Sequence, residues 1–140
     1  MKKVAWVCLL ICCSWAFAAS AWGDESKTEK VFKATVGSDG VQRVDILGGS
    51  YFFTPNHIIV KVNVPVTLVV KKESGIVPHN IVAKSPEAGI DFNEGMSSEP
   101  KSITFTPTKA GTYPFYCDKK LLFFESHREK GMEGVIEVIE

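Results

Sequence analysis

Hydrophobic and polar residues alternate along most of the chain after residue 30. Short runs with a period of two, rich in β-branched and aromatic residues, are typical of β-strands that bury one face. Glycine, serine and proline separate these runs, and they favour turns or interrupt a strand ladder. Eight strands are predicted in this way, at residues 31–36, 41–47, 57–62, 66–71, 80–83, 102–106, 112–117 and 135–139. Residues 85–100 and 118–131 are less regular and are predicted to be loops with a helical turn at most. The pattern predicts an all-β fold, a sandwich or barrel of about eight strands.

The first 21 residues follow a different pattern. Lys2 and Lys3 precede an apolar run over residues 4–17, and small residues follow it, as in a secretory signal peptide. The apolar run is too short to span a membrane comfortably. Cleavage after Ala18 or Ala21 fits the small residues, and we favour Ala21; an uncleaved anchor is the alternative. We therefore expect a signal peptide at residues 1–21 and one exported domain at residues 22–140, in the periplasm or a similar compartment, without stable membrane insertion.

Removal of that segment leaves a single cysteine. Cys8, Cys12 and Cys13 leave with the signal peptide, so Cys117 has no partner for an intramolecular disulfide. A lone thiol in an oxidising compartment has to be buried or occupied by a ligand to survive. Cys117 is therefore a candidate metal ligand or nucleophile, and a buried structural cysteine is the simpler alternative.

Charge and length set the remaining limits. The exported part keeps fourteen basic and sixteen acidic residues, which gives a net charge of about −2. This balance suggests neither nucleic acid nor an anionic membrane surface as a partner. About 119 residues suffice for one core and one domain, and we expect a monomer.

The candidate chemistry lies near the end of the chain. Cys117 is followed after nine residues by His127, and His127 after four by Met132. A thiolate, an imidazole and a thioether together suit copper that alternates between two oxidation states better than a hard, oxygen-seeking ion. His79, directly after Pro78 at the start of a predicted strand, supplies a further imidazole. Each donor alone has a structural interpretation, but all four together favour a metal site.

Two other residues, His57 and Met96, carry side chains that can bind a metal ion. His57 begins a predicted strand and is interpreted as structural, because it matches no position in the donor pattern. Met96 lies in an irregular segment and is interpreted as a packing residue. A hydrolytic cysteine–histidine pair is also disfavoured, since no third orienting group is evident and Met132 would have no role. We therefore expect no enzyme activity.

The donor motifs resemble those of the cupredoxins, nearest in pattern to plastocyanin and pseudoazurin. The likeness covers about residues 41–140, and it is carried by Pro78-His79-Asn80-Ile81-Val82, by Ala110-Gly111-Thr112-Tyr113 with Phe115-Tyr116-Cys117, and by His127 with Gly131-Met132-Glu133-Gly134. The resemblance implies a Greek-key β-sandwich with one copper ion, Cu(I) or Cu(II). It implies His79, Cys117 and His127 as strong ligands, Met132 as the weak axial ligand, and Asn80 beside the thiolate.

The resemblance also implies a function, with one departure from the family pattern. Cupredoxins of this kind carry electrons between a donor and an acceptor redox protein through the exposed edge of the second histidine, here His127. In the relatives two to four residues separate the cysteine from that histidine, whereas here nine do. The longer loop leaves open a modified site in which Glu125 or water replaces Met132. A copper carrier or sensor is the alternative function. Apolar residues 121–124 are interpreted as either a lid over the site or a docking patch.

Overall fold

The computed structural model describes residues 28–140, so the expected signal peptide lies outside the described residues. Within that part the chain forms ten strands and one short 3-10 helix, η1 (Pro86–Ala88), and no helix is long and apolar enough to cross a membrane. The strands are β1 (Val31–Lys33), β2 (Gln42–Gly49), β3 (Phe52–Thr54), β4 (His57–Lys61), β5 (Val66–Lys72), β6 (His79–Ser85), β7 (Ile90–Met96), β8 (Lys101–Phe105), β9 (Gly111–Tyr116) and β10 (Glu133–Ile139).

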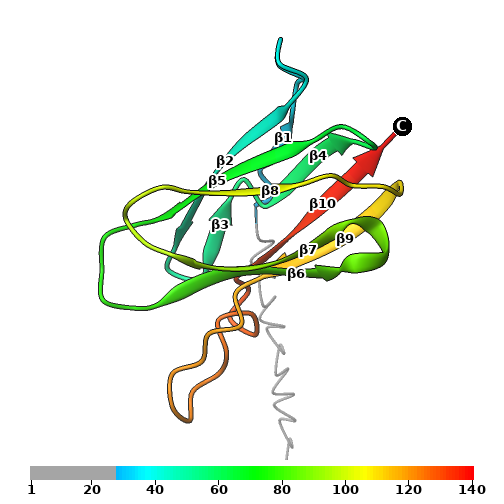
Figure 1. Ribbon diagram of the computed structural model, residues 1–140. Helices are drawn as coiled ribbons and strands as arrows, with labels where there is room; N and C mark the ends of the chain where they lie inside the picture. Colours follow the sequence, from blue (N-terminus) through cyan, green and yellow to red (C-terminus); the bar gives the residue numbers. More distant parts are fainter. Residues whose placement is uncertain (1–27) are drawn as a thin grey trace, which may run out of the picture.

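The strands form two mixed sheets that face each other (Figure 1). One sheet has six strands in the order β1-β4-β10-β9-β6-β7, and the other has four in the order β3-β2-β5-β8. Alternate residues of both sheets point inward and are buried; the least exposed, at 1% or below, include Ile46 and Leu68 on one side and Ile58, Phe115 and Ile136 on the other. The predicted all-β sandwich is confirmed, because period-two alternation gives each sheet one apolar face to bury.

Two strands were not predicted. β3 is only three residues long. β7 lies within residues 85–100, which the sequence predicts as an irregular loop because polar residues separate the apolar ones. Ile90, Phe92 and Met96 of β7 are nevertheless buried, while Asp91 and Asn93 are exposed, which is the alternation of a half-buried strand. β7 lies at the edge of its sheet and hydrogen-bonds only to β6, so fewer apolar positions are needed there. The predicted helical turn in this segment corresponds to η1.

The six-stranded sheet brings three distant segments to one end of the sandwich. β9 runs antiparallel to both β6 and β10, so the start of β6, the end of β9 and the start of β10 share the same end. The chain between β9 and β10 leaves the sandwich there as a projecting loop, drawn in orange in Figure 1. This loop, residues 117–132, carries three of the four predicted donors.

Candidate metal centre

Three predicted donors meet in the interior at this end. The Cys117 Sγ lies 4.0 Å from the His79 Nδ1 and 3.5 Å from the His127 Nδ1, and the two Nδ1 atoms are 3.1 Å apart. The centre of this triangle is about 2.1 Å from each corner, close to the roughly 2.0–2.3 Å bonds that a first-row metal ion such as Zn²⁺ makes to imidazole and thiolate. The donor triangle therefore has the size of a transition-metal site.

Strand ends fix the positions of these donors. His79 is the first residue of β6, because Pro78 before it has no amide hydrogen and disfavours an earlier start. Cys117 directly follows β9, and its amide donates to the Met132 carbonyl at 3.0 Å. The Met132 amide in turn donates to the His127 carbonyl at 2.8 Å. Backbone hydrogen bonds thus hold three donor residues of the loop to one another.

Asn80 lies beside the thiol, as the resemblance implies. Its backbone amide donates to the Cys117 Sγ at 3.5 Å. Its side-chain amide donates to Asp118 Oδ1 at 2.8 Å and to Asn93 Oδ1 at 2.9 Å, while its own Oδ1 accepts from the Asp118 amide at 3.1 Å. Asn80 therefore fastens Asp118, the residue after Cys117, to strands β6 and β7, and this limits the movement of the Cys117 backbone. Sequence reasoning did not identify Asp118 or Asn93, which stand in no recognisable motif.

Burial adjusts the protonation of the cluster. Burial, together with the neighbouring His127 and Lys72, lowers the pKa of His79 to about 4. Burial and then Lys130 lower the pKa of His127 as well. Both imidazoles are therefore neutral near pH 7, as metal binding requires. Burial also raises the pKa of the Cys117 thiol, so binding of a metal ion must displace its proton.

Met132, the fourth candidate donor, is fully buried, and its backbone bonds to Cys117 and His127 keep it beside the other three. Two neutral imidazoles, a thiol and a thioether fit the soft to borderline preference of copper. Among the described histidine, cysteine, aspartate and glutamate residues, only His79, Cys117 and His127 form a group suited to a metal ion. The donor chemistry and the geometry of this group therefore support copper as the cofactor.

The structure corrects one expectation, the exposed edge of His127. His127 is only 3% exposed, because the long loop folds back over it. Tyr51 packs edge-on against its ring with the centroids 5.1 Å apart, and the His127 amide donates to the Lys119 carbonyl at 2.8 Å. His127 also lines a pocket of about 240 Å³. The added residues between Cys117 and His127 thus cover the imidazole that a shorter loop would leave open.

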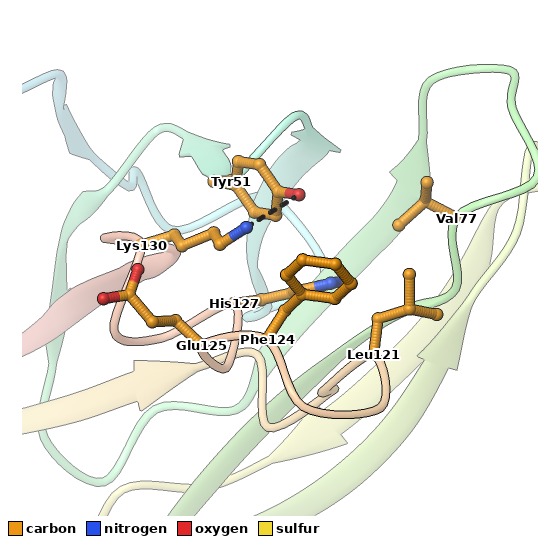
Figure 2. A pocket seen from close by; sticks show the side chains of 7 residues that line it. All are labelled: Tyr51, Val77, Leu121, Phe124, Glu125, His127 and Lys130. Atoms are coloured by element: carbon orange, nitrogen blue, oxygen red, sulfur yellow. Dashed lines mark hydrogen bonds between the residues drawn. The ribbon is translucent and has the colours of Figure 1, made fainter.

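Figure 2 shows this pocket. Leu121 and Val77 lie on one side and Glu125 and Lys130 on the other, with Phe124 and His127 between them. The Lys130 ammonium lies 4.7 Å from the centre of the Tyr51 ring and 6.0 Å from that of the Phe124 ring. The pocket walls are thus largely apolar and aromatic, with one cation at the edge.

The remaining loop residues divide into two groups. Glu125 is exposed and lies outside the donor group, so its carboxylate is not placed as a ligand. Leu122 and Phe123 do not line the pocket and are 76% and 98% exposed. The sequence of residues 121–124 is compatible with either a lid over the site or a docking patch. The structure divides them, since Leu121 and Phe124 line the pocket beside His127 whereas Leu122 and Phe123 face outward.

Comparison with known proteins agrees with this description. The chain matches the family model of the cupredoxin-like domain over residues 4–132. No curated protein matches the sequence. Among solved structures, a copper-binding protein in its apo form has 26% sequence identity and a TM-score of 0.54, with 77% of this chain and 96% of that chain covered.

Two further solved structures share the fold. The metal-binding domain of the Streptococcus pneumoniae D39 Cu(I)-exporting P-type ATPase CopA has 21% identity and a TM-score of 0.61, with 81% of this chain and 99% of that chain covered. Reduced auracyanin from Roseiflexus castenholzii has 21% identity and a TM-score of 0.58, with 76% and 99% covered. With the family match over most of its length, the buried donor triangle and the two-sheet sandwich, this chain belongs to the cupredoxin-like family.

Proposed function

We propose that the chain is an exported electron carrier that holds one copper ion through His79, Cys117, His127 and Met132. Its partners are two redox proteins, one that gives it an electron and one that accepts the electron. The chain itself catalyses no bond-making reaction. The predicted signal peptide at residues 1–21 supports export. The solved copper-binding protein at 26% identity supports copper as the ion.

The observation that carries this proposal is the donor triangle. Its three donor atoms lie 3.1–4.0 Å apart, held by strand ends and by the hydrogen bonds of Asn80. Copper supplies the one-electron exchange between Cu(II) and Cu(I). A fixed set of buried donors favours that exchange, because little of the protein has to move when the charge of the ion changes.

The residues around the donors have separate tasks. The Asn80 amide directs a hydrogen bond at the Cys117 sulfur, which stabilises a thiolate there. The neutral His79 and His127 rings present nitrogen lone pairs. Tyr51 and Phe124 keep water away from the His127 ring, except through the pocket.

Cys117→Ser tests the proposal. Serine has nearly the volume of cysteine but offers a hard oxygen of high pKa, so the strong thiolate bond to copper is lost. We expect the wild type to bind one copper ion and to show intense visible absorption with Cu(II). The variant should be colourless with an unchanged far-ultraviolet circular dichroism spectrum. A colourless wild type with full copper occupancy would contradict the thiolate assignment.

One observation favours a copper carrier as the second candidate. His127 is buried instead of exposed, so the family's usual port for electrons is covered. Two measurements separate the functions: the rate of electron exchange with a small redox mediator, and the rate of Cu(I) transfer to a chelator. Fast electron exchange with slow copper release supports the electron carrier, and the reverse supports the copper carrier.

A further inference from the structure

We propose that Gly48 and Met96 form a seat that positions the Met132 side chain at the copper site. Both are positioning residues, and neither is assigned as a ligand. The inference rests on the proposed function, because it concerns the axial donor of that same site. It starts from a close approach between the two sheets.

Gly48 lies near the end of β2, in the sheet opposite the donor triangle. A Cβ atom at this position would stand 2.9 Å from the Met96 Cε, 3.1 Å from the Met96 Sδ and 3.3 Å from the Met132 Cε. The two methionine side chains therefore converge on the space that the glycine leaves. Any larger residue at position 48 would have to displace one of them.

Met96 reaches this space from the strand beside the first donor. It is the last residue of β7 and is directly paired with His79 of β6, so the two side chains lie on the same face of the sheet. Met96 is 6% exposed, and Met132 is fully buried. Met96 thus packs in the same interior region as His79 and Met132, and not at the surface.

This packing matters because the backbone of a methionine does not by itself determine where its side-chain sulfur lies. The side chain has three rotatable bonds, and the backbone bonds of Met132 to Cys117 and His127 leave those torsions free. Contacts at the methyl end are then what limits the position of the thioether. The distance of an axial thioether from copper tunes the reduction potential of such sites. Gly48 and Met96 should therefore influence the potential without touching the metal.

Three variants test the seat. Gly48→Ala places a methyl group where the ends of both methionine side chains now lie. Gly95→Ala is the matched control. Gly95 adjoins Met96 in β7, but a Cβ atom at Gly95 would have no atom within 4 Å. Met96→Leu keeps the apolar volume while replacing the unbranched thioether, a swap that well-packed cores usually tolerate. We expect Gly48→Ala and Met96→Leu to change the visible band ratio and the reduction potential, and Gly95→Ala to match the wild type.

A metal-free measurement completes the test. In the apo protein with ¹³C-labelled methionine methyl groups, we expect nuclear Overhauser contacts from both the Met96 and Met132 methyls to the Gly48 α-protons. Met96→Leu should shift the Met132 methyl resonance and Gly95→Ala should not. Missing contacts, or a potential unchanged in both Gly48→Ala and Met96→Leu, would overturn the inference. A wild type without copper colour but with these contacts would instead contradict the proposed function and leave the packed seat standing.

Discussion

The His57 side chain joins the segment before β1 to the six-stranded sheet. Its Nδ1 lies 2.6 Å from a Glu29 carboxylate oxygen, and its Nε2 lies 2.7 Å from one of Glu137. Burial lowers the pKa of His57, but the hydrogen bonds to Glu137 and Glu29 outweigh it, and the net pKa is raised. These contacts agree with the structural role that the sequence suggested for His57. The residue is not a member of the donor triangle.

We expect His57 to make stability depend on pH. Because its folded pKa is above the unfolded value, its contribution is complete below about pH 6.5 and is lost as the pH rises through the folded pKa. The free energy of unfolding in urea should therefore fall more between pH 6 and pH 8 for the wild type than for His57→Gln. Equal falls in the two proteins would show that the paired histidine contributes nothing.

The donors could be predicted from the sequence because each stands in a motif that also dictates local structure. His79 follows a proline at a strand start, and Cys117 follows a strand, so residue type and position agree. The burial of His127 could not be predicted, because it depends on how nine loop residues fold back. Gly48 directly follows the predicted strand at residues 41–47, and only the packing between the sheets shows that its missing side chain makes room for Met96 and Met132.

Among the elements, the loop between β9 and β10 departs furthest from the family pattern. Its tip is closed by a turn in which the Phe124 amide donates to the Leu121 carbonyl at 3.0 Å, and by a β-bridge between Lys120 and Ser126. Leu122 at the tip has a positive φ of 49°, which non-glycine residues rarely adopt. The loop is therefore a folded element with an inner and an outer side.

The two sides allow a matched test of the lid. Replacing Leu121 and Phe124 together by serine removes apolar pocket walls, and water should reach the His127 ring more freely. Replacing Leu122 and Phe123 by serine changes a similar apolar area that faces solvent. We expect the first pair to speed electron exchange with a small charged mediator several-fold in stopped-flow measurements, and the second pair to leave it unchanged. Equal rates for both pairs and the wild type would show that the loop is no barrier.

At the scale of the molecule, Gln42 links the two sheets. It belongs to β2 of the four-stranded sheet and is fully buried. Its side-chain amide donates to the carbonyls of Lys61 and Val64 at 3.2 Å each, and its Oε1 accepts from the Lys61 amide at 2.7 Å. Lys61 ends β4 of the six-stranded sheet, so one side chain satisfies the backbone of the turn that crosses between the sheets.

Gln42→Leu should therefore destabilise the whole sandwich. Leucine fills a similar space but removes the part-buried hydrogen bonds to the backbone of Lys61 and Val64, and a buried group left without its partner costs about 1–3 kcal/mol. We expect a loss of that order or more in the free energy of unfolding, measured by urea titration of the apo protein. Thr67→Val on β5 serves as the control and should change stability little, because the Thr67 side chain makes no such bond to any residue in the described range 28–140. A loss below about 0.5 kcal/mol for Gln42→Leu would contradict the bridging role.

The buried His127 ring makes access to the copper site a question of molecular size. The ring borders a pocket of about 240 Å³, which Tyr51, Phe124 and Leu121 also line. A small reductant can enter a space of that volume and approach the imidazole, whereas a flat protein surface is held away by the thickness of the loop. For the electron carrier proposed above, this end of the sandwich would favour small electron donors over flat protein surfaces, and a protein partner would have to insert a protruding segment or displace the loop to come equally close to the ring.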